Sequence, residues 1–214
     1  MTETGGTPQE AFWAGEFGDE YTRRNQGDDV VAANTALFAR ALAATGGIEN
    51  ILELGANRGL NLRSLSHLLP NARQEAVEIN AEAAACLREE HPEAVVHTAS
   101  LLDFEPAAAS DLVLLKGVLI HLAPEVLEQA YARIRRVARR YVLMAEYYNP
   151  SPVEIPYRGH EGKLFKRDFA GEFLDQAPDF RLRDYGFVYR RDPNFPQDDI
   201  TWFLLERTEG ESLC

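Results

Sequence analysis

Between residues 50 and 148, short apolar segments typical of strands alternate with segments typical of amphipathic helices. The strand-like segments are "NILELG", "QEAVEIN", "AVVHTAS", "DLVLLKGV" and "YVLMAEYY", and the helix-like ones are "LNLRSLSHLL", "AEAAACLREE" and "PEVLEQAYARIRRVARR". This alternation is typical of right-handed crossovers between the strands of a mainly parallel sheet. We therefore predict an α/β fold on a single doubly wound sheet, and we place "RIRRVARR" on the polar face and end of a helix.

The two ends of the chain differ from this central region. Residues 9–44 are mostly helix-compatible and stop at two glycines, which predicts an N-terminal helical segment over 1–45 ahead of one domain over 46–214. After Tyr148, a proline-containing loop leads to a helix from about Phe165 to Gln176 and then to two strands, "FRLRDYGFVYR" and "DITWFLLERT". Their connection is too short for a crossover helix, so we expect them to pair antiparallel at one edge of the sheet.

Composition limits the classes of function. The 214 residues are 45% hydrophobic, enough for a single domain with its own core. The 22 basic and 34 acidic residues give a net charge of −12, which argues against nucleic acid and anionic membranes as partners. Cys86 and Cys214 do not suggest a disulfide framework, and no secretory signal or membrane-spanning apolar run is present, so we expect a cytoplasmic protein. The five histidines show no short metal-ligand spacing, and we predict no metal site.

The segment "ILELGANRGLN" at 51–61 has the form of a strand, a glycine turn and a helix. Such a turn places backbone N–H groups at the carboxyl edge of a parallel sheet, where α/β proteins bind ligands. Asn57 stands where a dinucleotide site needs its second glycine, so a close pyrophosphate contact is not expected. Glu78 ends the next strand, where an acid can accept hydrogen bonds from ribose hydroxyls. The pattern favours an adenosine-type ligand over a turn without a ligand.

These motifs resemble those of class I S-adenosylmethionine-dependent methyltransferases. "ELGANRG" resembles the family's glycine turn, Glu78 its ribose acid, "TASLLDF" its third-strand segment and "DLVLLKGVLIHL" its fourth strand and following loop. The departures are Asn57 for the middle glycine and Ser100 where an aspartate is frequent. The resemblance implies a Rossmann-like methyltransferase fold with S-adenosylmethionine as cofactor.

The flanking segments 12–25 and 157–175 resemble the methylases associated with pseudaminic acid biosynthesis. In that family the first segment is a lid over the cofactor, which implies that Tyr21, Arg24 and Asn25 bind its methionine end. The spacing of Trp13, Phe17 and Tyr21 is equally that of a helix face packed on the core. The resemblance implies a nonulosonic acid or its nucleotide-sugar precursor as acceptor.

Residues of three kinds are candidates for the site. We expect the cofactor to be bound by Trp13, Tyr21, Arg24, Asn25, Glu53, Gly55, Asn57, Gly59, Glu78, Ile79, Ser100, Leu101, Lys116 and Gly117. His121 is the candidate general base, because an unperturbed histidine pKa of about 6.5 suits neutral pH, with a structural histidine as the equal alternative. The basic stretch 157–168 is either a solvated face or an anion-binding acceptor pocket, for which the candidates are Tyr147, Tyr157, Arg158, His160, Lys163 and Lys166.

Other functions stay open on the sequence alone. One is methyl transfer to another small molecule or to RNA, against which the net charge argues. The other is a non-catalytic module that binds S-adenosylmethionine. The sequence predicts no oligomeric state and does not identify the methylated atom.

Overall fold

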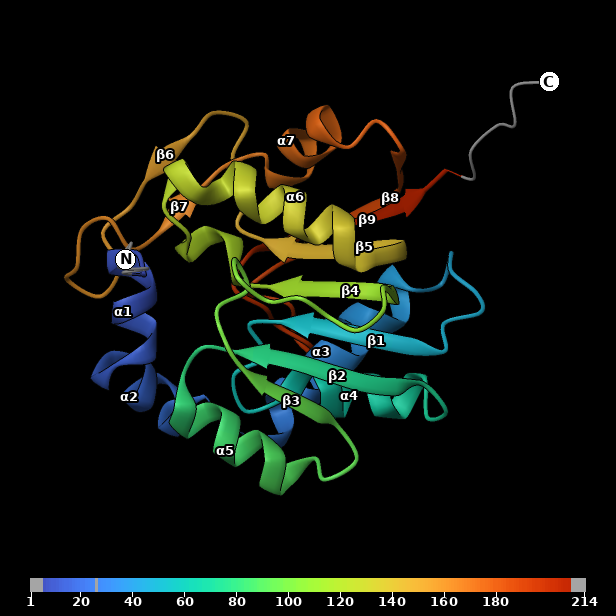
Figure 1. Ribbon diagram of the computed structural model, residues 1–214, viewed down its shortest axis with the longest axis horizontal. Coiled ribbons are helices and arrows are strands. Elements are labelled where there is room, and N and C mark those ends of the chain that lie inside the picture. The colour runs from blue at the N-terminus through green and yellow to red at the C-terminus, as the bar shows by residue number, and fades with distance from the viewer. Residues whose placement is uncertain (1–5, 26, 209–214) are drawn as a thin grey trace.

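Seven strands form one sheet in the structure, a computed structural model that describes residues 6–25 and 27–208 (Figure 1). The strand order is β3-β2-β1-β4-β5-β9-β8. The strands are β1 (Asn50–Leu54), β2 (Arg73–Glu78), β3 (Val95–Thr98), β4 (Ser110–Lys116), β5 (Ala138–Glu146), β8 (Phe180–Val188) and β9 (Ile200–Arg207). The first five pair in parallel, so the predicted doubly wound, mainly parallel sheet is confirmed.

The last two strands reverse this direction. β9 runs antiparallel both to β5 and to β8, and β8 is the edge strand. Residues 189–199 connect the two strands without a helix, and a connection of this kind cannot cross over the sheet. The predicted antiparallel edge is confirmed.

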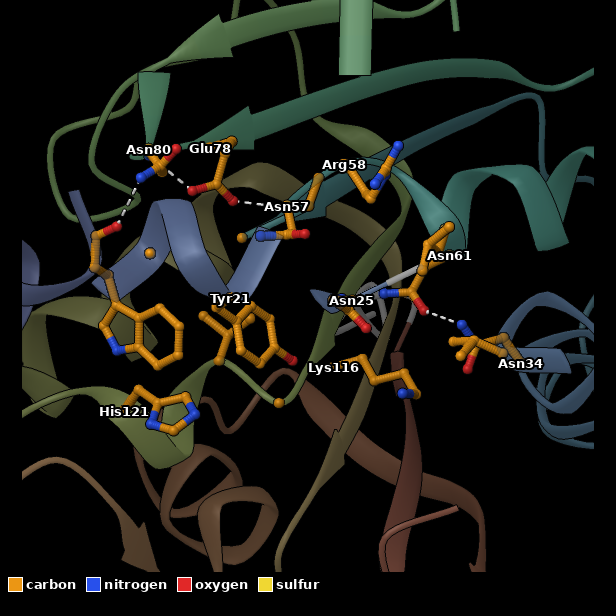
Figure 2. A pocket seen from close by; sticks show the side chains of 18 of the residues that line it. Tyr21, Asn25, Asn34, Asn57, Arg58, Asn61, Glu78, Asn80, Lys116 and His121 are labelled. Atoms are coloured by element: carbon orange, nitrogen blue, oxygen red, sulfur yellow. Dashed lines mark hydrogen bonds between the residues drawn. The ribbon is translucent and has the colours of Figure 1, made fainter. Parts of the chain in front are cut away.

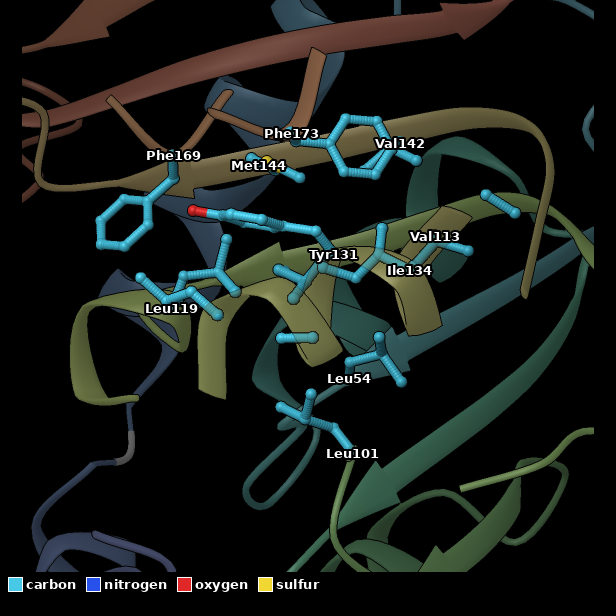
Figure 3. Close-up of a cluster of buried hydrophobic side chains, with 14 of the residues drawn as sticks. Leu54, Leu101, Val113, Leu119, Tyr131, Ile134, Val142, Met144, Phe169 and Phe173 are labelled. Carbon is cyan, nitrogen blue, oxygen red and sulfur yellow. The ribbon is translucent and has the colours of Figure 1, made fainter. Parts of the chain in front are cut away.

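Helices cover both faces of the sheet. On one face lie α3 (Asp28–Ala41), α4 (Leu60–Leu68) and α5 (Ala81–Glu90), and on the other α6 (Leu127–Val137) and α7 (Phe169–Gln176). In β1, Leu52 and Leu54 pack toward α6, as Figure 3 shows for Leu54, whereas Ile51 packs toward α3 and α4. Burial on both faces explains why the central strands are almost continuously apolar.

Two boundaries differ from the sequence prediction. "RIRRVARR" is helical only as far as Val137, because Ala138 begins β5 and Arg139 pairs with the buried Asp111 beside it. The helix expected from Phe165 begins at Phe169, where Asp168 caps its first turn. Before it, β7 (Phe165–Lys166) pairs with β6 (Val153–Glu154) in a short hairpin.

The N-terminal segment divides into two parts. α1 (Pro8–Ala14) and α2 (Glu16–Arg24) lie beyond the carboxyl ends of the parallel strands (Figure 1). α3 instead contributes Leu37 and Phe38 to the core. Only α1 and α2 therefore have the position of a lid, and the boundary at residue 45 stays a prediction.

Two further findings concern the described residues. None of their helices is both long and apolar enough to span a membrane. Cys86 is half-buried and free, and Cys214 lies outside the described part of the chain.

Candidate active site

The glycine turn at residues 55–59 joins β1 to α4 at the carboxyl edge of the sheet. Gly55 and Gly59 have φ values of +76° and +85°, a region that favours glycine. A Cβ on Gly55 would lie 2.6 Å from Cγ2 of Val118, so space also requires glycine there. Asn57 has a φ of 49°, which asparagine tolerates. The turn therefore forms with Asn57 in place of a middle glycine.

Hydrogen bonds to Glu78 connect this turn to the end of β2. Its carboxylate accepts hydrogen bonds from the backbone N–H groups of Asn57, at 2.7 Å, and Asn80, at 2.8 Å. Burial raises the pKa of Glu78, and these backbone bonds oppose the rise. Each oxygen keeps a lone pair, and the side chain lines a cavity (Figure 2). Glu78 thus has both a structural role in the turn and the position of a ligand acceptor.

The lid helices are bound to the turn by side-chain amides. Asn80 donates to the backbone oxygen of Trp13, at 3.2 Å, and to Asp19, at 2.7 Å. Asn57 donates to Oγ1 of Thr22 at 2.9 Å. These contacts place α1 and α2 over the ends of β1 and β2.

Gly18 is the residue that lets the lid lie this close. A Cβ there would lie 1.9 Å from the backbone oxygen of Trp13 and 2.8 Å from Nδ2 of Asn80. We expect Gly18→Ala to displace α2 from Asn80 and to make proteolytic cleavage within 13–25 several-fold faster in the presence of S-adenosylhomocysteine. Gly46→Ala, which meets nothing within 4 Å, is the matched control. Equal cleavage rates in the two variants would mean that this contact does not hold the lid.

The basic stretch lies against the same lid. Lys163 donates from Nζ to the backbone oxygen of Pro8 at 3.0 Å and lies 4.9 Å from the ring centroid of Phe12. Gln9 donates to the oxygen of Gly162 at 3.1 Å. The ring of His160 contacts that of Phe12 with centroids 5.0 Å apart. Lys163 and His160 therefore hold α1 in place.

His121 lies under Trp13, with ring centroids 4.5 Å apart. Its Nδ1 donates to the carbonyl oxygen of Lys163 at 2.7 Å, and because a carbonyl only accepts, the ring proton is on Nδ1. Burial lowers the pKa of His121 to about 4, opposed by this hydrogen bond. The pKa near 6.5 assumed from the sequence is thus wrong for the folded protein, and His121 is neutral at pH 7 with Nε2 unprotonated.

Several acidic side chains lie close to Lys116, the last residue of β4. Burial lowers the pKa of Lys116, opposed by Glu53, Asp198 and Glu146. Burial also raises the pKa of Glu53 to about 8 and that of Tyr21 to about 12. Tyr21 therefore keeps its proton at neutral pH. In Figure 2, Tyr21 lies between His121 on one side and Lys116 on the other.

Tyr21, Lys116, His121 and Asp198 line one cavity of about 660 Å³, within the range of roughly 300–1,000 Å³ typical of ligand sites. The predicted cofactor residues that line it are Trp13, Tyr21, Asn25, Gly55, Asn57, Glu78, Ile79, Ser100, Leu101, Lys116 and Gly117, together with His121. Arg24, Glu53 and Gly59 do not line it, although Glu53 is buried beside it. None of the predicted acceptor residues lines it either: Tyr147, Tyr157, Arg158, His160, Lys163 and Lys166.

Several lining residues were not predicted. Asn61 lies in the first turn of α4, Asn34 belongs to α3, and Gln197 and Asp198 come from the β8–β9 loop, residues 189–199. Only Asn80 had a readable signal, since an asparagine after a strand and before a helix is a typical N-cap. The others come together only through the tertiary fold.

The cavity fits S-adenosylmethionine. Glu78 offers acceptor lone pairs near the turn, and two buried polar atoms of lining residues, Oδ1 of Asn57 and Nε1 of Trp13, have no hydrogen-bond partner in the described structure. Within the described residues, no group of three or more histidine, cysteine, aspartate or glutamate side chains is placed to hold a metal ion.

Known proteins are similar to this chain at two levels. Residues 51–140 match the family model described as Methyltransferase domain. A magnesium protoporphyrin IX methyltransferase (ChlM) from Synechocystis PCC 6803 with bound SAM aligns at 14% identity and a TM-score of 0.67 over 97% of this chain and 100% of its own. The search of curated proteins gave no significant match.

Two further solved structures have the same fold. A 1,6-didemethyltoxoflavin-N1-methyltransferase from Burkholderia thailandensis aligns at 19% identity and a TM-score of 0.69, over 98% of this chain and 94% of its own. The N-methyltransferase NodS from Bradyrhizobium japonicum aligns at 13% identity and a TM-score of 0.63, over 89% of this chain and 99% of its own. At these identities the likeness shows the fold, which is that of Rossmann-like methyltransferases.

The family match covers the glycine turn, Glu78 and β4, and residues of all three line the cavity. Together with the shared fold, this match supports S-adenosylmethionine-dependent methyl transfer as the activity of the chain.

Proposed function

We propose that this enzyme methylates a small molecule that carries an acidic group. The observation that carries the proposal is a single cavity with cofactor-binding features at one end and the Lys116 amine among polar side chains at the other. S-adenosylmethionine, when bound, supplies an activated methyl group on a sulfonium. The protein's own residues then orient the acceptor and exclude water. The Burkholderia structure contains the small molecule 1,6-didemethyltoxoflavin, which supports an acceptor of that size.

We place the adenine of the cofactor on one side of Glu78 and its methionine end on the other side, toward Lys116. Glu78 accepts from the ribose hydroxyls, and Ile79, Ser100 and Leu101 enclose the adenine. Toward Lys116, the backbone of Gly55 and Gly117 and the side chains of Tyr21 and Asn25 bind the methionine end. Asn57 contributes its unpartnered Oδ1. Arg24, the last residue of α2, and Gly59, the N-cap of α4, act only through these helices.

Two cations of the basic stretch, which lie outside the cavity, support the proposal of an acidic acceptor. Arg158 lies 5.8 Å from the ring centroid of Tyr157, and Lys166 lies 5.0 Å from that of Tyr147. Tyr147 in turn contacts Asp198, a lining residue, at 3.5 Å. We therefore place Arg158 and Lys166 at the entrance for the acceptor, whereas Lys163 is engaged by the lid.

Nonulosonic acids and their nucleotide-sugar precursors are the acceptors that we infer. They combine an acidic group with hydroxyls and amides, and the flanking segments 12–25 and 157–175 resemble methylases associated with pseudaminic acid biosynthesis. If the accepting atom must lose a proton, His121 is the base, because its unprotonated Nε2 is available at neutral pH. A carboxylate acceptor needs no base.

The acceptor class is tested with methyl-deuterated S-adenosylmethionine and mass spectrometry of the product. We expect label in a nonulosonic acid or its nucleotide-activated form and none in the matching sugar without the acid. Arg158→Ala and Lys166→Ala should each raise the acceptor KM several-fold and leave the cofactor Kd unchanged. Arg183→Ala, on the exposed part of β8, is the control.

Lys116→Gln separates two possible roles of the Lys116 amine, in cofactor binding and in acceptor binding. A weaker Kd for S-adenosylhomocysteine would assign Lys116 to the cofactor, and a higher KM alone would assign it to the acceptor. Labelling of the acid-free sugar at the same rate would contradict the proposal of an acidic acceptor.

A further inference from the structure

Three amide side chains form a continuous row of hydrogen bonds along the cavity. Gln197 donates to Oδ1 of Asn34 at 2.9 Å, and Asn34 donates to Oδ1 of Asn61 at 2.8 Å (Figure 2). Asn61 then donates to Oε1 of Glu53 at 2.6 Å. The four residues come from the β8–β9 loop, α3, α4 and β1. We call this row the amide chain.

All the donors of the amide chain point the same way, toward the Glu53 carboxyl group. Bonds aligned in this manner polarise one another, and those inside a protein are stronger than those in water. Asn34 is 1% exposed and Glu53 is fully buried, so water does not readily replace a broken link. A change in hydrogen-bond strength at one end of the amide chain therefore alters the strength of the bonds at the other end.

The two ends of the amide chain serve different parts of the cavity. Asn61 and Asn34 line it beside the glycine turn, whereas Gln197 lines it from the loop that also supplies Asp198. Glu53 lies behind the wall, and its second oxygen, Oε2, has no partner among the described residues. The amide chain thus connects the cofactor end of the site to the loop at the acceptor end.

We propose that the amide chain couples closure of the β8–β9 loop to cofactor binding, with Asn34 and Asn61 as its positioning residues. A cation bound near Glu53 favours the carboxylate over the carboxylic acid. A carboxylate accepts the Asn61 bond more strongly, because charge-assisted hydrogen bonds are the stronger ones. Asn61, Asn34 and Gln197 then hold the loop. The pKa of Glu53, raised to about 8 by burial, leaves this group able to respond near neutral pH.

The inference rests on the proposed function in one respect, the placement of the acceptor beside this loop. The coupling itself is between cofactor and loop, so S-adenosylhomocysteine alone is the probe. It lacks the methyl group but keeps the ammonium and carboxylate of the methionine end. Binding of S-adenosylhomocysteine to the unmodified protein tests the function, and the comparison of variants tests the coupling.

The experiment is hydrogen exchange of residues 189–199 with and without S-adenosylhomocysteine. We expect the ligand to slow exchange in the unmodified protein about tenfold and to leave it unchanged in Gln197→Met and Asn34→Asp. Asn34→Asp keeps the acceptor for Gln197 and replaces the donor to Asn61 by an oxygen. Gln197→Met changes only a half-buried loop side chain, so it tests the proposal even if Asn34→Asp does not fold.

Asn194→Ala is the control, since Asn194 lines the cavity from the same loop but is outside the amide chain. It should keep the protection. Coupling is reciprocal, so the Kd of S-adenosylhomocysteine should rise in Gln197→Met by about the factor of protection that is lost. The same ligand-induced protection in Gln197→Met and the unmodified protein, or an unchanged Kd, would overturn the proposal.

Discussion

Replacing His121 by asparagine should lower kcat about 10²-fold or more on an acceptor that loses a proton, with little change in the Kd of S-adenosylhomocysteine. General-base catalysis typically contributes 10²–10⁴-fold. Asparagine can still donate to the carbonyl of Lys163, as Nδ1 of His121 does, but has no basic nitrogen. His121→Ala removes both the hydrogen-bond donor and the basic nitrogen. Equal losses of kcat in the asparagine and alanine variants would therefore identify His121 as the base.

The pH dependence follows from the lowered pKa. Because burial brings the pKa of His121 to about 4, the base form persists well below the ordinary histidine value. We expect the acid limb of the kcat profile of the unmodified enzyme to lie below pH 5, without an inflection near 6.5. Recovery of most of the rate in His121→Asn would instead show that His121 acts by holding Trp13 and the 157–163 loop in place.

The fold was readable from the sequence because its determinants are local. Both faces of β1, β4 and β5 are buried, which gives the apolar runs that mark parallel strands, and the loop after β8 is too short for a crossover. The errors fell where a tertiary contact decides. Arg139 is drawn into β5 by the buried Asp111, and the residues before α7 pair with β6 instead of extending the helix.

The part of the cavity formed by the glycine turn and Glu78 was readable from the sequence for a similar reason. Gly55, Asn57 and Glu78 lie within one strand–turn–helix–strand unit, where spacing along the chain fixes position in space. The residues that α3 and the β8–β9 loop bring to the cavity were not readable, because these elements are more than 150 residues apart at Asn34 and Gln197. A charge-rich stretch also gives no sign of its partner. Lys163 was expected to bind an anion, and in the structure it binds the backbone of Pro8.

Replacing Glu78 by alanine should weaken binding of S-adenosylhomocysteine roughly ten- to hundredfold, measured by calorimetry. Hydrogen bonds to a charged group contribute about 1.5–3 kcal/mol each, and Glu78 is the buried carboxylate at the predicted ribose position. The variant also leaves the N–H groups of Asn57 and Asn80 without their acceptor. A lower melting temperature is therefore expected alongside the weaker binding.

The two effects are separated by a second pair of variants. Asn80→Ala removes the amide that binds Trp13 and Asp19 but leaves the Glu78 carboxylate, and Glu75→Ala changes an acid on the same strand that pairs with His97 outside the cavity. Glu75→Ala should leave the Kd unchanged. Asn80→Ala should loosen the lid with a smaller loss of affinity than Glu78→Ala. If Glu78→Ala binds S-adenosylhomocysteine as tightly as the unmodified protein while its melting temperature falls, Glu78 serves only to hold the glycine turn, and the ribose contact belongs to another lining residue.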